Sequence, residues 1–83
     1  MKPEQLGKVI GENVKARRKE LGYTQEAVAN VCGVSPERIS QIEHSVGNVP
    51  HPILALLSEA LGCSVPSLVT ENSFVAPKKL SKV

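Results

Sequence analysis

Aromatic side chains are nearly absent from this sequence of 83 residues, which has one tyrosine, one phenylalanine and no tryptophan. Aliphatic side chains must therefore build the core, and this favours small, packed helices. The scarcity of aromatic rings also argues against a stacking platform for single-stranded nucleic acid. A chain of this length suffices for one domain. It buries only about 60% of the surface that its unfolded form exposes, so dimerisation would help to stabilise it.

Residues for catalysis and metal binding are also scarce. Aspartate is absent, no nucleophile lies at a useful spacing from a base, and no glycine-rich loop has the pattern of a phosphate cradle. Cys32 and Cys63 form no CxxC motif, and no histidine cluster accompanies them, so nothing indicates a disulfide framework or a zinc site. We expect no enzymatic activity and no cofactor, and we expect both cysteines to be core residues rather than redox sensors.

Long apolar runs are missing as well. No stretch approaches the ~20 residues needed to span a bilayer. The N-terminal segment MKPEQLGKVI is polar and mixed, unlike a signal peptide. We therefore expect a soluble protein that resides in a reducing cytoplasm and has no membrane partner.

Positive charge is unevenly distributed, although the formal net charge is only +2. Residues 39–77 contain no lysine or arginine. The basic residues are Lys2, Lys8, Lys15, Arg17, Arg18, Lys19 and Arg38 in the first half, and Lys78, Lys79 and Lys82 in the tail. A basic first half can approach phosphate groups. The alternative is that these charges are solvated helix ends without a ligand.

Apolar residues recur at helical spacing, and no strand pattern of any length occurs. Leu6, Ile10 and Val14 are four residues apart, which predicts a first helix over about residues 4–20 with these side chains facing the core. Gly22 then ends the helix.

Two short helices are predicted next, joined by a tight turn. Thr24 is a good N-cap for the first of them, which ends at Gly33. Ser35 caps the second, which runs from about Pro36 to His44. Because the glycine turn is so short, the two helices must cross at a steep angle.

Leucines at 54, 57 and 61 predict a fourth helix that begins near Pro52, and Ser64 can cap a last short helix. Beyond Thr70 the periodicity is lost. We interpret residues 1–69 as one domain and residues 70–83 as a tail that forms an ordered arm, a dimer element or a flexible end.

The stretch TQEAVANVCGVSPERISQIE, residues 24–43, resembles the helix-turn-helix of the phage repressor and Cro family, also called the XRE type. The resemblance extends to IGENVKARRKELGYTQ before it and to LALLSEALGCSVPSLV after it. It implies an all-α fold, a compact, lambda-repressor-like bundle of about five short helices in which the second and third form the helix-turn-helix.

The resemblance implies that the third helix reads base edges in the major groove of double-stranded DNA. At 100° per residue, Ile39 and Ile42 share an inward face, whereas Glu37, Gln41 and His44 point outward. Gln41 suits a bidentate contact with adenine, and Glu37 can accept a hydrogen bond from the amino group of cytosine. The alternative is a solvated polar face, which is the usual fate of a polar helix side.

The other candidate DNA-binding residues are Ser35, Arg38, Ser40 and Gln25. Ser40 and Arg38 flank the outward face, and Arg38 can reach a phosphate or a guanine; alternatively it pairs with a local carboxylate. In the family, the glutamine that matches Gln25 binds the phosphate backbone at the start of the second helix. The alternative for Gln25 is a capping or solvated side chain.

Arg18 and Glu43 match family positions that form a partly buried ion pair between the first and third helices. Such a pair would orient the reading helix rather than add net stability. We expect Arg18 to be structural, which leaves Arg17 and Lys19 for solvent or phosphate. The sequence departs from the family at Pro36, where relatives often place a base-contacting side chain, and after Glu43, where the expected basic residues are missing.

These observations predict a sequence-specific transcriptional regulator, a repressor that acts as a homodimer on a palindromic operator. By analogy with relatives, the dimer interface would involve Val65, Leu68 and Phe74. The alternative is an antitoxin or another protein-interaction module, which binds a partner such as a toxin and represses its own promoter. In that case Val75, Leu80 and the basic tail would carry the interaction.

Overall fold

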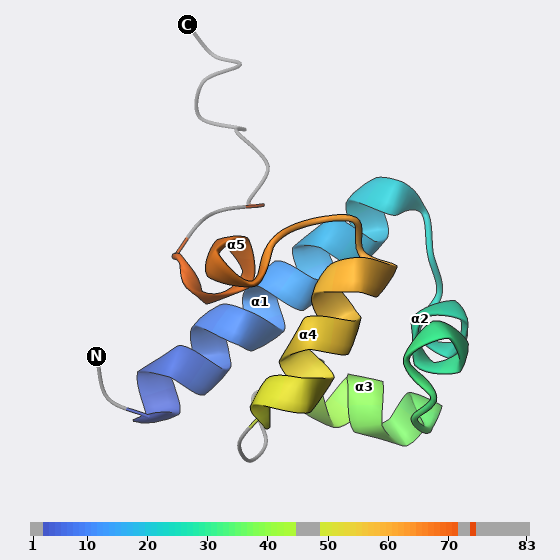
Figure 1. Cartoon of the computed structure of the whole chain (residues 1–83), viewed down its shortest axis with the longest axis horizontal. Helices are drawn as coiled ribbons and strands as arrows, with labels where there is room; N and C mark the ends of the chain where they lie inside the picture. The colour runs from blue at the N-terminus through green and yellow to red at the C-terminus, as the bar shows by residue number, and fades with distance from the viewer. Residues whose placement is uncertain (1–2, 45–48, 72–73, 75–83) are drawn as a thin grey trace, which may run out of the picture.

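The computed structural model describes residues 3–44, 49–71 and 74, which form five α-helices and no strand (Figure 1). The predicted all-α bundle is confirmed, and every predicted helix is found close to its expected position. Residues 45–48 and most of the predicted tail, including Val75, Leu80 and the three lysines, lie outside the described residues. The helices are α1 (Pro3–Leu21), α2 (Gln25–Cys32), α3 (Pro36–Glu43), α4 (His51–Ala60) and α5 (Val65–Val69).

Hydroxyl side chains begin three of the five helices. In each case the hydroxyl oxygen accepts a hydrogen bond from the backbone N–H three residues further on, which satisfies a donor that has no partner within the helix. The capping residues are Thr24 at 3.0 Å from the nitrogen of Ala27, Ser35 at 3.2 Å from that of Arg38, and Ser64 at 3.3 Å from that of Ser67.

The turn between α2 and α3 depends on Gly33. Its φ angle is +72°, a left-handed backbone conformation that residues other than glycine rarely adopt. From this position the backbone N–H groups at the end of α2 bond to the carbonyls of Ala29 and Asn30, and the chain reverses within three residues into α3. Figure 1 shows α2 nearly end-on beside α3, which lies across the view, so the two helices cross steeply, as the sequence predicted.

Aliphatic side chains from all five helices form one core. Ala29, on α2, is completely buried, and its small side chain allows α2 and α3 to cross closely. Cys32 is also buried, whereas Cys63 is half-buried at the edge of the core. The largest apolar side chains that are fully buried are Ile39, Ile42, Leu57, Leu61, Leu68, Val14 and Val28.

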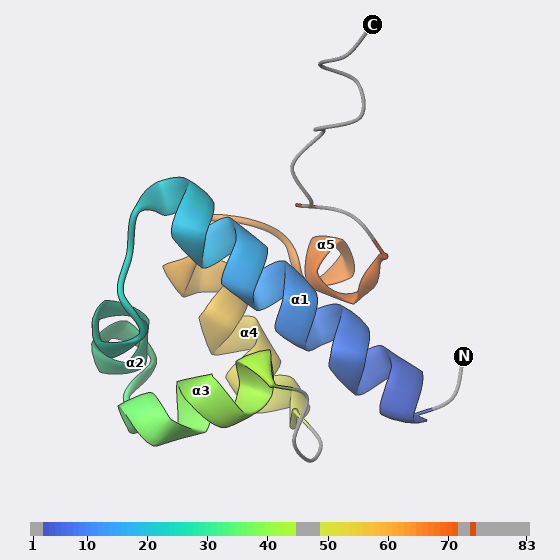
Figure 2. The same ribbon diagram turned by 180° about the vertical axis from the view of Figure 1, so that it is seen from behind.

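The helices form a closed ring of contacts around this core. Helix α1 packs against α3 and α5, α2 packs against α3 and α4, and α4 packs against α5. Figure 2 shows α1 crossing the front of the molecule with α3 below it, while α4 lies behind. Helix α3 is therefore held by α1 and α2, and its remaining surface is turned away from the bundle.

Two polar side chains of α1 bind the ends of the last two helices. Asn13 is 1% exposed, and its side-chain nitrogen lies 3.2, 2.8 and 2.9 Å from the carbonyl oxygens of Ser67, Leu68 and Thr70. The nitrogen carries two hydrogens, so two of these carbonyls share one of them. The Nε atom of Arg17 donates to the carbonyl of Leu61 at 2.8 Å. Carbonyls at the ends of α4 and α5 thus find partners on α1.

Two predictions about apolar side chains are wrong. Leu6 was expected to face the core but is 37% exposed, because the first turns of α1 reach past the other helices (Figure 2). Leu68 was expected in a dimer interface but is completely buried, because α5 directs it between α1 and α4. Phe74, from the predicted tail, is half-buried and packs against the core.

Candidate nucleic-acid interface

Helix α3 has one apolar face and one polar face, as its sequence predicted. Ile39 and Ile42 are buried in the core. Glu37, Gln41 and His44, which lie on the opposite side of the helix, are exposed. We call these three residues the polar edge of α3, and the described part of the chain does not cover it. The helix therefore presents hydrogen-bonding side chains outward while two isoleucines anchor it from behind.

The side chains that flank this edge are less accessible. Ser35 is exposed, and its hydroxyl oxygen caps the helix. Arg38 and Ser40 are half-buried at the sides of the helix. Pro36 occupies the first helical position, where a missing N–H has no consequence. Among the predicted residues of this segment, Ser35, Glu37, Gln41 and His44 are thus exposed, while Arg38 and Ser40 lie half-buried beside them.

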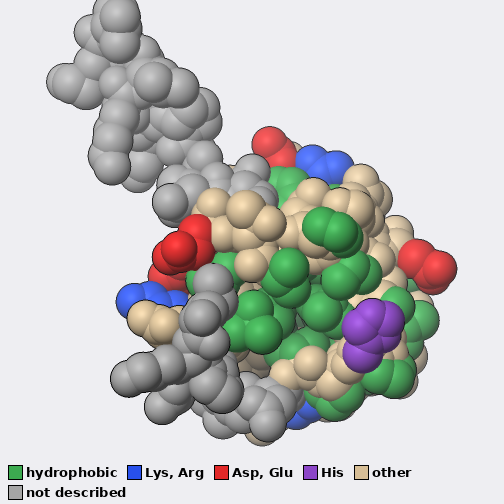
Figure 3. Space-filling view, turned by 60° about the vertical axis from the view of Figure 1, so that its left-hand side comes forward, with side chains coloured by type: hydrophobic (Ala, Val, Ile, Leu, Met, Phe, Trp, Pro, Cys, Tyr) green, Lys and Arg blue, Asp and Glu red, His purple; other side chains and the backbone are tan. Residues whose placement is uncertain are grey.

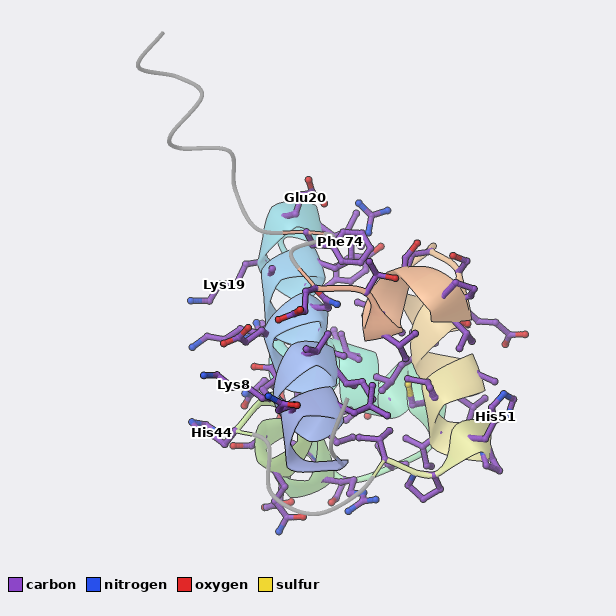
Figure 4. The ribbon with its side chains drawn as sticks, turned by 90° about the vertical axis from the view of Figure 1, so that its left-hand side faces the viewer. Lys8, Lys19, Glu20, His44, His51 and Phe74 are labelled. Atoms are coloured by element: carbon purple, nitrogen blue, oxygen red, sulfur yellow. The ribbon has the colours of Figure 1, made fainter. Side chains whose placement is uncertain are left out.

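His44 ends α3 and is fixed against its own helix. Its Nδ1 atom lies 2.7 Å from the carbonyl oxygen of Ser40 and 3.4 Å from the hydroxyl oxygen of the same residue. Because a carbonyl only accepts, Nδ1 must carry the hydrogen in that contact, which leaves Nε2 as an acceptor in the neutral ring. Figure 4 shows His44 projecting on the same side of the molecule as Lys8 and Lys19 of α1.

The carboxylate of Glu43 joins α3 to the first two helices. The Nε atom of Arg18 lies 2.6 Å from Oε2 of Glu43, and Nη2 lies 3.0 Å from Oε1. The Glu43 side chain is 1% exposed and the Arg18 side chain 11%. The hydrogen bond with Glu43 raises the pKa of Arg18, and burial opposes that rise only in part. The Arg18 guanidinium therefore keeps its charge, and the two parallel contacts fix the relative orientation of the two side chains.

Gln25 also binds Glu43. Its Nε2 atom donates to Oε1 of Glu43 at 3.1 Å, and its side chain is half-buried. A fourth contact of this cluster runs from Nη1 of Arg18 to the carbonyl of Tyr23 at 2.8 Å, just before α2 begins. The cluster of Arg18, Gln25 and Glu43 therefore holds the end of α1, the start of α2 and the end of α3 together.

Arg17 has a different place from the one expected. It was predicted to be left for solvent or phosphate, but its guanidinium binds Leu61 and lies 2.7 Å from the Glu20 carboxylate. The ring of Phe74 lies over it, with 5.6 Å between the guanidinium carbon and the ring centroid. The sequence contained a signal for this: Asn13 and Arg17 are polar residues four positions apart beside the apolar stripe of α1. Lys19 is exposed, as expected.

The cysteines show no feature of a reactive site. Burial raises the pKa of the Cys32 thiol, and it also raises that of Cys63, where the charge of Arg17 offsets part of the effect. Among the described residues, no three metal-ligating side chains come together. No helix in the same residues is long and apolar enough to cross a membrane.

The short α2, the glycine turn and the polar edge of α3 define a helix-turn-helix DNA-binding domain. Residues 14–68 match the helix-turn-helix family, and because this is more than half of the chain, the protein belongs to that family. It is a helix-turn-helix transcriptional regulator of the XRE type, and not an enzyme.

Among its relatives is control protein C.SmaI of Serratia marcescens, which is 33% identical over 67 residues, or 81% of this chain and 80% of that protein. Repressor protein C2 of Salmonella phage P22 is 43% identical over 56 residues, which are 68% of this chain but only 26% of the repressor. The crystal structure of the P22 c2 repressor with a synthetic operator has a TM-score of 0.71 and 40% identity, covering 76% of this chain and 96% of that one.

Proposed function

We propose that this protein binds an inverted-repeat operator as a homodimer, with α3 of each copy in the major groove, and that it represses transcription there. The observation that carries this proposal is the polar edge of α3. Glu37, Gln41 and His44 are exposed while Ile39 and Ile42 are buried, so the helix can enter a groove without losing its anchorage. The likeness to a repressor whose structure contains an operator supports the same use of this edge.

Each residue of the edge has a role that its chemistry suggests. The amide of Gln41 can donate to and accept from the major-groove edge of adenine, and Glu37 can accept from the amino group of cytosine. His44 offers its Nε2 atom as an acceptor. Ser35, Arg38 and Ser40 flank the edge and would contact the sugar–phosphate backbone or neighbouring bases.

Gln25 would contact a phosphate without leaving the cluster. Its amide nitrogen carries two hydrogens, and the bond to Glu43 uses one of them. The other can bind a phosphate oxygen beside the first turn of α2, where the helix dipole also favours negative charge. In this reading Arg18 stays with Glu43 and orients α3, and it makes no main contact with DNA.

A second copy of the chain would cover an apolar face. Figure 3 shows hydrophobic side chains gathered on the side of the molecule that carries α4 and α5. Ile53 of α4, with Val65 and Val69 of α5, is only half-buried in the monomer. Pairing through this face would place two reading helices about one DNA turn apart, roughly 34 Å, on an inverted repeat.

The proposal is tested by selecting bound duplexes from a random pool with the purified protein. The expected result is that the selected duplexes share an inverted repeat. In addition, the logarithm of the binding constant should fall linearly with the logarithm of the salt concentration, with a slope of about −0.9 for each neutralised phosphate. Gln41→Ala should relax the preference at one base position of each half-site, whereas Glu59→Ala, on the exposed side of α4, serves as the matched control. Recovery of unrelated sequences would refute specific recognition. Recovery of sites without symmetry, together with sedimentation of the protein as a monomer, would refute the dimer.

The alternative, an antitoxin-like partner protein, rests on Val75, Leu80 and the basic tail. These residues lie outside the described part of the chain, and no observation in the described part favours that reading over the first.

A further inference from the structure

A glycine stands in the interior of α1 at a point of close contact with α3. Gly11 is buried, although glycine is among the least favourable residues for a helix interior. A Cβ atom at this position would lie 2.4 Å from the carbonyl oxygen of Ile42 and 3.0 Å from that of Glu43. Both are backbone atoms, so no side-chain rotation can relieve the contact.

The atoms that Gly11 approaches belong to the last turn of α3. This turn precedes His44 and contains the residue that Arg18 binds. Gly11 and Arg18 are seven residues apart, which is close to two helical turns, so they lie on the same face of α1 about 10 Å apart. One face of α1 therefore holds α3 at two points: Arg18 binds the carboxylate of Glu43, and Gly11 meets its backbone.

We propose that Gly11 is a positioning residue for DNA recognition. Its hydrogen, in place of a side chain, lets the end of α3 lie directly on α1 and so sets how far Gln41 and His44 project from the molecule. The inference rests on the proposed function, because it concerns how the reading helix is presented to DNA. Gly11 itself lies behind α3 and touches no DNA.

The size of the effect follows from the contact. Real Cβ atoms stay beyond about 3.0 Å from such neighbours, so an alanine at position 11 must move α1 and the end of α3 apart by at least about 0.6 Å. Ile39, which is fully buried, and the packing of α3 against α2 hold the first part of the helix, so the displacement of its end would tilt α3. Hydrogen bonds to base edges vary by only a few tenths of an ångström in length, and recognition sites require placement within about 0.5 Å.

The test compares Gly11→Ala with the unaltered protein on two duplexes of equal length, the selected operator and a random sequence. We expect operator affinity to fall at least tenfold, as for the loss of one bidentate base contact, while affinity for the random duplex stays within twofold. Amide chemical shifts of the free variant should change mainly in residues 36–44. The control is Ala16→Gly, on another face of α1, which weakens the helix without adding bulk toward α3; it should keep its operator affinity.

Operator binding by a folded Gly11→Ala chain within threefold of the unaltered protein would overturn the inference. If the variant fails to fold, proton–proton contacts in the unaltered protein decide instead: nuclear Overhauser effects between the Hα atoms of Gly11 and residues 42–44 support the close approach, and their absence refutes it. Failure of the unaltered protein to select any DNA sequence is a different outcome, which refutes the proposed function rather than the placement of α3 by Gly11.

Discussion

Removal of the Arg18 side chain is the most direct perturbation of the structure behind the polar edge. In Arg18→Ala, the Glu43 carboxylate loses both guanidinium contacts, at 2.6 and 3.0 Å, and keeps the hydrogen bond from the amide of Gln25. The carboxylate is 1% exposed, so water can replace little of what is lost. The variant therefore leaves a poorly compensated charge inside the protein.

The magnitude follows from that burial. Breaking a buried ion pair by removing one partner destabilises proteins by about 3–5 kcal/mol. Because Gln25 still donates to the carboxylate, we expect about 3 kcal/mol, near the lower limit. In a domain of this size, 1 kcal/mol shifts the melting temperature by roughly 4–8 °C, so melting should fall by about 12–24 °C. An exposed pair would have contributed at most about 1 kcal/mol.

A double-mutant cycle in urea denaturation measures the pair itself. Arg18→Met with Glu43→Leu removes both charges and keeps apolar volume, and such replacements are often neutral. We expect the double variant to unfold within about 1 kcal/mol of the unaltered protein, so that the two single changes are strongly coupled. Operator binding is measured on each folded variant. If Arg18→Ala melts like the unaltered protein and binds operator as well, the pair neither stabilises nor orients α3.

Three further predictions concern other residues. Asn13→Asp would place a carboxylate among three carbonyl oxygens, and we expect the free energy of unfolding in urea to fall by at least about 2 kcal/mol. A change below roughly 0.5 kcal/mol, the level of a neutral surface substitution, would contradict the role of Asn13 in binding the end of α5. Gln41→Ala should weaken operator binding by about 1–3 kcal/mol without altering thermal melting, and a parallel loss of stability would point to a structural residue. At pH 8, a thiol reagent should modify Cys63 before Cys32, because Cys32 is more deeply buried, whereas at Cys63 the charge of Arg17 offsets part of the rise in pKa that burial causes; Cys63→Ser assigns the fast phase, and equal rates would contradict the assignment.

The helix-turn-helix was predictable because its signals are local. Each helix boundary there depends on a residue acting within one turn, such as the hydroxyl of Ser35 or the left-handed Gly33. The two faces of α3 follow from helical periodicity alone, so the exposure of Gln41 and the burial of Ile39 needed no knowledge of neighbouring helices. The resemblance then supplied the partner of Arg18, which periodicity could not.

The residues that the sequence misplaced or did not single out depend on contacts between distant segments. Arg17 and Asn13 bind backbone carbonyls more than 40 positions away along the chain. Their spacing beside the apolar stripe of α1 marks them as a pair, but the sequence does not show which distant carbonyls they bind. Leu68 was assigned to an interface by analogy with relatives, and the sequence alone does not show whether an apolar residue in a short last helix faces the core or a partner. The role of Gly11 could not be predicted for the same reason, since its small size matters only once α3 lies across α1.

Helix α1 connects the two surfaces that the proposed function requires. On one face, Gly11 and Arg18 hold the end of α3; on another, Asn13 and Arg17 hold the ends of α5 and α4. A helix of 19 residues with both sets of contacts is close to a rigid rod. If two copies pair through α4 and α5, the separation and tilt of their reading helices are then fixed through α1 and not through a flexible connection. The fit to an operator of defined spacing would therefore depend on side chains that touch neither DNA nor the partner copy.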